Sequence, residues 1–160
     1  MTARVLAPLP RAPIPWHLLP MAGYSGRSLV DKLGIKPKKR VAILRAPKGY
    51  ARTLGKLPEG VTVTSVARGR LAFIHIFTST IRDLSKRFPT LASALQDDGM
   101  LWVSWPKRVS GVATDLTEDE IRVIGLPHGL VDVKVCAVDE TWSGLKFVRR
   151  VENRRPDKRA

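Results

Sequence analysis

The chain has 160 residues, of which 44% are hydrophobic and 26% are charged. This is the length of one ordinary domain and the composition of a soluble globular protein. The single cysteine, Cys136, excludes an internal disulfide framework and is typical of a reducing compartment, so we expect a cytoplasmic protein. No apolar run approaches the ~20 residues of a membrane span, and we expect no membrane partner.

The formal net charge is +14, and it is unevenly distributed. Residues 1–70 carry 14 Lys and Arg against two acidic residues, whereas residues 71–148 carry 8 against 10. Residues 149–160 carry 6 against 2. The basic character therefore lies at the two ends. It indicates a solvated basic surface, with weak binding of nucleic acid or another polyanion through the basic termini as the alternative.

The first 20 residues differ from the rest of the chain. They contain five prolines, which interrupt every apolar run that a helix or a secretory signal would need. We therefore expect a disordered Pro-rich leader over 1–20, one α/β domain over 21–151 and a basic tail over 152–160. Met21 is an alternative start of the protein, in which case the leader is an upstream misreading of the gene.

The first half of the predicted domain alternates between helices and apolar strands. Short apolar runs bounded by Gly and Pro indicate buried strands, and strict alternation indicates an edge strand. In chain order we expect a helix over 27–33 capped by Ser25 or Gly26, a strand over 41–44, a weak helix from Tyr50 to about Gly55, an edge strand over 61–66 and a buried strand over 71–77.

The second half continues this alternation and ends in a hairpin. Thr117 to Glu120 form a capping box, which predicts the start of a helix. In chain order we expect a helix capped by Thr78 or Ser79, a second short turn beginning at Pro89, a strand over 100–105 buried on both faces, a helix over about 118–126, and two strands over 130–138 and 144–151.

This order predicts an α/β fold, a three-layer Rossmann-like and mostly parallel sheet with a C-terminal antiparallel hairpin. In such a sheet, ligands bind in the crevice beyond the carboxyl ends of the strands. Aromatic walls with a few polar groups are typical of a small-molecule site, whereas the alternative is a polar hairpin whose Trp142 only covers the end of the sheet. The ligand-binding candidates at this edge are Lys48, Tyr50, Ser104, Trp105, Lys107, Asp139, Glu140 and Trp142.

Other reactive side chains favour structural roles. Asp139 and Glu140 could form a carboxylate pair for acid–base chemistry, but an ion pair with Lys107 or Arg108 is favoured because neighbours on a strand point in different directions. His75 lies within an apolar strand and is expected to be a hydrogen-bonded core histidine. The three histidines lack ligand spacing, so no metal site is expected. Cys136 is expected to be a small buried hydrophobe.

Several motifs after residue 20 resemble a small bacterial family known as a domain of unknown function. They are MAGYSG at 21–26, KLGIKP at 32–37, LWVSWPK at 101–107, TDLTED at 114–119 and LVDVKVCAVDETWSGLKFV at 130–148. The strand order also resembles the catalytic core of the Rossmann-like methyltransferases that use S-adenosylmethionine (SAM), whose seventh strand is antiparallel. These resemblances imply a fold and leave the activity open.

The methyltransferase resemblance is weakest at the cofactor loop. Those enzymes have a Gly-rich loop after the first strand and an acidic residue at the end of the second, which holds the ribose hydroxyls. Here the first loop is Arg45–Tyr50, with one glycine and one proline, and the second strand continues into Ala67 and Arg68. Both departures disfavour SAM as a cofactor.

Three functions follow from these patterns. We expect a non-catalytic protein that binds a small-molecule ligand or acts as a regulator. One alternative is a SAM-dependent methyltransferase with a degenerate cofactor loop. A second alternative is an accessory protein that binds RNA or another polyanion. The sequence assigns no catalytic residue and leaves the oligomeric state open.

Overall fold

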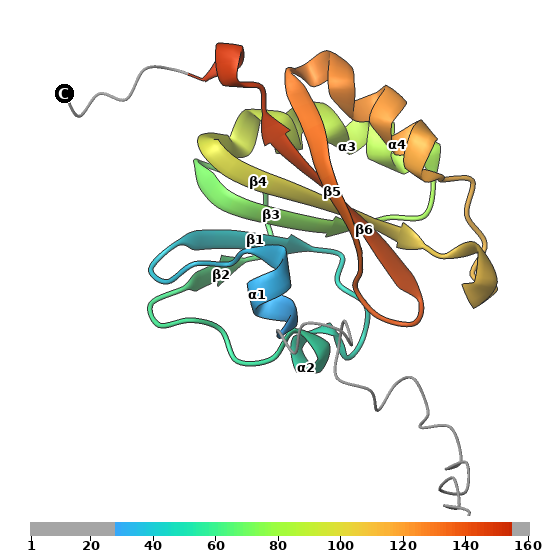
Figure 1. Cartoon of the computed structure of the whole chain (residues 1–160), viewed down its shortest axis with the longest axis horizontal. Coiled ribbons are helices and arrows are strands. Elements are labelled where there is room, and N and C mark those ends of the chain that lie inside the picture. The colour runs from blue at the N-terminus through green and yellow to red at the C-terminus, as the bar shows by residue number, and fades with distance from the viewer. Residues whose placement is uncertain (1–27, 155–160) are drawn as a thin grey trace, which may run out of the picture.

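A computed structural model describes residues 28–154, which form a six-stranded sheet between two layers of helices (Figure 1). The predicted leader, the first residues of the predicted domain and most of the basic tail lie outside the described residues. The elements in chain order are α1 (Leu29–Leu33), β1 (Arg40–Leu44), α2 (Tyr50–Leu54), β2 (Thr62–Thr64), β3 (Leu71–Phe77), α3 (Ile81–Ala94), β4 (Leu95–Pro106), α4 (Glu118–Gly125), β5 (Leu130–Ala137) and β6 (Trp142–Arg149). Short 3₁₀ turns follow β4, α4 and β6.

The strand order is β2-β1-β3-β4-β6-β5. Strands β1 to β4 pair in parallel, whereas β6 is antiparallel to both of its neighbours. Strand β6 is therefore inserted between β4 and β5, and β5 runs in the same direction as β4. This mixed, mostly parallel sheet confirms the predicted α/β Rossmann-like fold and the single antiparallel strand of the terminal hairpin.

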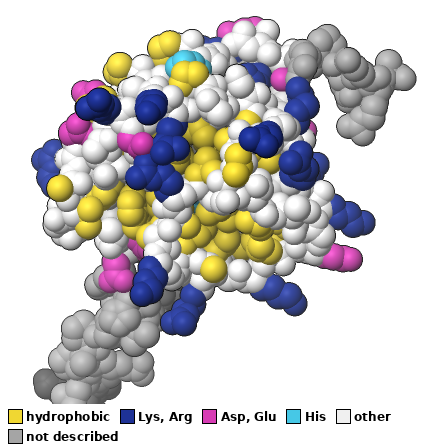
Figure 2. All heavy atoms as spheres, turned by 180° about the vertical axis from the view of Figure 1, so that it is seen from behind, with side chains coloured by type: hydrophobic (Ala, Val, Ile, Leu, Met, Phe, Trp, Pro, Cys, Tyr) yellow, Lys and Arg dark blue, Asp and Glu magenta, His cyan; other side chains and the backbone are white. Residues whose placement is uncertain are grey.

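Basic side chains surround an apolar area on the back of the molecule. Figure 2 shows apolar side chains gathered in the middle of this face, with Lys and Arg spread around the border. Lys and Arg side chains at such a border can cover apolar surface with their aliphatic stems while their charged ends remain in water.

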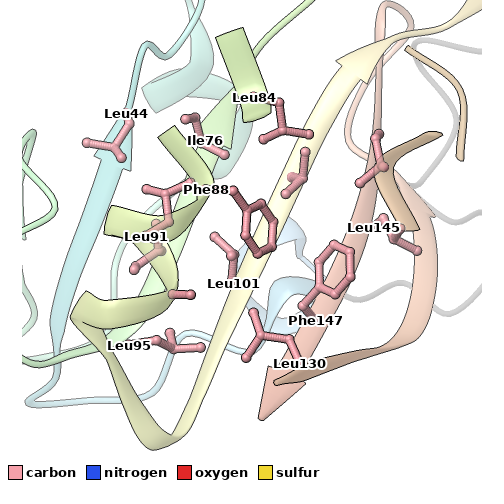
Figure 3. Close-up of a cluster of buried hydrophobic side chains, with 14 of the residues drawn as sticks. Leu44, Ile76, Leu84, Phe88, Leu91, Leu95, Leu101, Leu130, Leu145 and Phe147 are labelled. Carbon is pink, nitrogen blue, oxygen red and sulfur yellow. The ribbon is translucent and has the colours of Figure 1, made fainter. Parts of the chain in front are cut away.

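Each face of the sheet has its own hydrophobic core. One core lies under α3 and α4, and Figure 3 shows Phe88 of α3 pointing toward Phe147 of β6. The centres of these two rings are 5.6 Å apart in an edge-to-face arrangement. The other core lies under α1 and α2 and includes Phe73 and Trp102. Strand β4 supplies alternate residues to both cores, which confirms that it is buried on both faces.

Helix α3 is one continuous helix, so the prediction of a second turn at Pro89 is wrong. Leu84, Phe88 and Leu91 are buried along one stripe that extends on both sides of the proline. Burial of this stripe outweighs the backbone bond that proline removes. The cap is also later than predicted, because the hydroxyl of Thr80 accepts the first-turn bond from the amide of Asp83 at 3.0 Å.

Two shorter helices are held by specific hydrogen bonds. The predicted start of α4 at Thr117 is confirmed, since the Thr117 hydroxyl accepts the N-cap bond from the amide of Glu120 at 3.1 Å. Helix α1 begins at the N-cap Ser28, and the indole N–H of Trp102 donates to the carbonyl of Leu33 at 2.8 Å. This bond attaches α1 to the centre of the sheet, whereas the predicted caps at residues 25 and 26 lie outside the described residues.

Candidate functional site

The candidate site is the carboxyl edge of the parallel strands. The chain leaves β1 toward β2 on one side and returns through β3 on the other, so the strand order reverses between β1 and β3. A crevice at such a point is the usual ligand site of an open α/β sheet. The loops that follow β1, β2, β3 and β4 all begin at this edge.

A charged network crosses the edge between β1 and β3. The guanidinium of Arg45, directly after β1, donates to a carboxylate oxygen of Asp83 on α3 at 2.6 Å. The Thr78 hydroxyl donates to the same oxygen at 2.6 Å, and Arg87 donates to the other oxygen at 2.9 Å. Burial raises the pKa of Asp83, but the bonds from Thr78 and Arg87 and the charge of Arg45 outweigh it, and the pKa falls below its ordinary value. Asp83 is therefore ionised at neutral pH.

The loop after β4 is attached to the start of α3, beside this network. The backbone amide of Ile81 donates to the Asp115 carboxylate at 2.7 Å, and the Thr114 hydroxyl donates to the carbonyl of Ser79 at 2.7 Å. These two bonds fix the position of the first turn of α3. They give the edge a rigid border on the β3–β4 side.

A hollow of about 610 Å³ lies between β1, β2 and α2 on the other side of the edge. Gly49, with a positive φ of 88°, turns the chain from β1 into α2. A side-chain carbon at Gly49 would meet nothing within 4 Å, so the loop leaves open space beside it. The walls are mostly apolar, and the hydroxyl residues Thr64 and Ser65 lie at the end of β2. The apolar lining residues include Ile43, Tyr50, Leu54, Leu57 and Val63.

Tyr50 connects this hollow to a buried polar chain. Its hydroxyl lies 2.7 Å from Nδ1 of His75, and the Ser104 hydroxyl lies 2.7 Å from Nε2 of the same ring. Burial lowers the pKa of His75 to about 3, so the ring is neutral and one nitrogen donates while the other accepts. Burial, and then the charge of Cys136, raises the pKa of Tyr50 above its ordinary value. The prediction of a hydrogen-bonded core histidine is confirmed.

The predicted aromatic residues lie on different faces of the sheet. Trp105 is 8% exposed and packs in the core under α3 and α4. Trp142 packs against the core under α1 and α2, where Tyr50 also lies. Phe77 connects the last two, with ring-centre distances of 4.8 Å to Tyr50 and 5.1 Å to Trp142. The three aromatics therefore do not form the walls of one pocket, because consecutive positions in a strand face opposite sides.

The remaining ligand-binding candidates do not share one hollow. Lys107 and Glu140 border a hollow of about 540 Å³, and Trp105 borders another of about 630 Å³ in the loop before α4. Lys48 is exposed, and Ser104 is fully buried in the His75 chain. The structure therefore brings Lys107 and Glu140 together but separates them from Tyr50 and Trp105.

Asp139 has a structural role in the β5–β6 turn. One carboxylate oxygen accepts bonds from the amides of Thr141 and Trp142, both at 2.8 Å. Within residues 28–154, no ion pair joins Asp139 or Glu140 to Lys107 or Arg108, so the favoured ion pair is absent. The reason is that the two turn amides bind the Asp139 carboxylate locally.

Residues 28–154 offer neither a cluster of metal ligands nor a helix that could span a membrane. The described residues contain no group of three or more His, Cys, Asp or Glu that could hold a metal ion. None of their helices is long and apolar enough to cross a membrane. Cys136 is half-buried in β5, and burial raises the pKa of its thiol despite the nearby charges of Lys32 and Lys134.

Sequence reasoning missed Arg45, Asp83 and Asp115. The position of Arg45 at the edge follows from the end of the predicted strand, but its positive φ of 59° and its bond to Asp83 do not. Asp83 is separated from Arg45 by 38 residues, and no local pattern indicates that pairing.

The structure was compared with known proteins. No family model and no curated protein matches the chain. Magnesium protoporphyrin IX methyltransferase from Synechocystis PCC 6803 with bound SAH is similar, with 16% identity, a TM-score of 0.54, and coverage of 76% of this chain and 78% of that chain. The same enzyme with bound SAM has 14% identity, a TM-score of 0.51 and coverage of 76% and 74%. Ribosomal protein L11 methylase from Lactobacillus delbrueckii subsp. bulgaricus has 15% identity, a TM-score of 0.50 and coverage of 82% and 77%.

These likenesses establish the methyltransferase-like fold and correct one expectation. The sequence predicts a non-catalytic ligand-binding or regulatory protein, but the similar structures are methyltransferases, two of them with SAM or SAH bound. The resemblance to the bacterial family of unknown function stays a prediction, since no family model matches.

Proposed function

We propose that the protein is a SAM-dependent methyltransferase with an altered cofactor loop. The observation that carries this proposal is the hollow between β1, β2 and α2 at the carboxyl edge of a sheet with a methyltransferase-like fold. We assign the cofactor to this hollow, next to the point where the strand order reverses.

The residues around the hollow fit the nucleoside part of SAM. Apolar side chains such as Leu54 and Leu57 suit the faces of an adenine ring. In place of the acidic residue, Thr64 and Ser65 offer hydroxyls, which can pair with ribose hydroxyls because both groups donate and accept. The loss of a charged acceptor makes each of these bonds weaker.

The loop after β1 suits the amino-acid part of SAM in a different way. Pro47 supplies no backbone donor and Arg45 is already paired with Asp83, but Lys48 is exposed on the same loop. Its positive charge can pair with the carboxylate of the cofactor. One positive side chain would thus take the place of the missing glycine amides.

When bound, SAM supplies a methyl group on a positively charged sulfur. The protein's own residues position the reactants, because the buried Tyr50 keeps its proton and both ring nitrogens of the buried His75 are engaged by hydroxyls. Asp83 is ionised and already bound by Arg45 and Arg87. A proton released in the reaction therefore goes to solvent, and the proposal implies an acceptor atom that attacks the methyl group without first losing a proton, such as the nitrogen of a neutral amine.

The proposal is tested by titrating SAM into the full chain in a calorimeter. We expect a dissociation constant below ~1 mM, equivalent to a binding free energy beyond about −4 kcal/mol. The variant Ala51→Trp places a ring at the border of the hollow and should weaken binding by about tenfold, or about 1.4 kcal/mol. The control Thr53→Trp lies on the same helix outside the lining and should leave the affinity unchanged. Absent binding, or equal loss in both variants, would contradict the proposal.

A further inference from the structure

Four lysines gather on the α1 face of the β5–β6 hairpin, away from the proposed cofactor hollow. Lys134 of β5 and Lys146 of β6 are directly opposite each other in the antiparallel register. Lys146 in turn pairs with Trp102 of β4, whose indole is bonded to α1 on this face. Both side chains therefore stand on the side that α1 occupies, and Figure 1 shows α1 and the hairpin on the near side of the molecule.

Helix α1 adds the other two charges. Lys32 lies in the last turn of α1 and Lys36 follows it, and the bond from Trp102 to Leu33 holds this segment against the sheet. Burial, together with the charges of Lys134 and Lys36, lowers the pKa of Lys146. The charges of Lys32 and Lys134 act together on Cys136, which lies two residues beyond Lys134. The four ammonium groups therefore act on one small area, which we call the lysine face.

None of the four lysines belongs to an ion pair recorded within residues 28–154. The ion pairs of these residues are made by arginines. Asp31, the acidic residue of α1, has an interaction of its own. Like charges directly opposite each other destabilise a sheet, so this arrangement lowers the stability of the hairpin. An anionic partner would remove that repulsion.

The same face carries an aromatic side chain farther along β6. Residues at every second position share a face, so Trp142, Gly144 and Lys146 lie in one row. Trp142 is half-buried, with its ring edge-to-face against Phe77, and it lies at the carboxyl edge of the sheet. Surfaces that bind single-stranded nucleic acid typically combine positive charges that follow the sugar–phosphate backbone with aromatic side chains on which bases stack.

We propose that the lysine face binds the phosphate backbone of single-stranded nucleic acid. This site differs from the basic termini considered above, because it is built from α1, β5 and β6. It also stands apart from the methyltransferase proposal, since it uses none of the residues around the cofactor hollow. Phosphates would pair with the four ammonium groups, and a base would stack on the accessible part of Trp142.

The test measures fluorescence anisotropy of labelled oligouridylate and oligothymidylate with the full chain over a range of salt concentrations. Log affinity should fall with log salt by about 0.7 for each phosphate contacted on a single strand. The double variant K134Q/K146Q should reduce this slope by about 1.4. The control K56Q/K86Q also removes two positive charges, one just after α2 and one on α3, both away from the hairpin. It should leave the slope unchanged.

Thermal melting checks that both double variants fold. K134Q/K146Q should melt at the same temperature as the natural chain or higher, because a repulsion is removed, and its affinity for SAM should be unchanged. If both double variants lost the same affinity for the oligonucleotides, the positive charge of the whole surface would explain the binding, and this result would overturn the proposal. So would no binding by the natural chain, tighter binding to duplex, or a preference for vesicles with anionic lipids.

Discussion

The fully buried His75 links the centre of the sheet to the wall of the proposed cofactor hollow. Its ring holds Tyr50 at the start of α2 and Ser104 on β4, each at 2.7 Å. The hollow for the cofactor lies on the other side of Tyr50. A neutral histidine satisfies both hydroxyls without burying a charge, so this chain fixes the position of the cofactor loop at low electrostatic cost.

Removing the Tyr50 hydroxyl should leave a ring nitrogen of His75 without a partner. We expect Tyr50→Phe to lower the free energy of unfolding by about 1–3 kcal/mol, measured by urea denaturation. Ser104→Ala should have a similar effect for the same reason. The exposed hydroxyl of Ser65 provides the control, and Ser65→Ala should change stability by less than about 0.5 kcal/mol. A neutral Tyr50→Phe variant would show that the chain contributes nothing to stability.

The buried histidine also predicts a pH dependence. Its folded pKa of about 3 lies below the ordinary value of 6.5, so below that ordinary value only the unfolded state takes up the proton. Stability should therefore fall by up to about 1.4 kcal/mol per pH unit as the pH decreases from about 6 to 4.5. His75→Gln should lose this slope in the same denaturation series. Parallel slopes for the two proteins would contradict the assignment of the slope to His75.

At the scale of elements, the apolar strands could be predicted because turn residues bound each run. Strand β3 has the bounds expected for it, and α4 begins directly after its N-cap Thr117. What could not be predicted depends on contacts between distant segments. The continuation of α3 through Pro89 depends on a core shared with β3, β4 and β6, and the separation of Trp105 from Trp142 depends on the β4–β6 register.

Pro89 offers a test of how α3 is stabilised. If packing alone keeps the helix continuous, Pro89→Ala should restore the missing backbone bond and raise the free energy of unfolding by about 1 kcal/mol or more. Denaturation by urea measures this change. A loss of stability would mean that the proline ring makes a favourable contribution to this part of the helix.

Gly144 tests the close packing of β6 against β4. A side-chain carbon at this position would lie 3.1 Å from the indole of Trp102 and 3.3 Å from the hydroxyl of Ser104. We expect Gly144→Ala to lower the free energy of unfolding by about 1–3 kcal/mol, because both neighbours are fully buried. A side-chain carbon at Gly99 would also be crowded, so that glycine cannot serve as the control. Thr53→Ala changes an exposed residue instead and should leave the free energy of unfolding nearly unchanged.

At the scale of the whole molecule, the carboxyl edge could be located from the predicted strand order. The residues that line a hollow at this edge could not. The hollow forms because α2 is only five residues long and β2 only three, so their apolar side chains leave space beside β1. The lysine face forms on the same side of the sheet at its opposite end, over β5 and β6. The two proposed sites therefore flank the α1 layer and can be altered separately.

A structure determined with SAH present tests the central claim most directly. Our account predicts ligand density in the hollow between β1, β2 and α2, with the adenine against Leu54 or Leu57 and the ribose within hydrogen-bond distance of Thr64 or Ser65. Density at another place on the chain, or an empty hollow at a SAH concentration well above 1 mM (binding weaker than about −4 kcal/mol), would contradict it.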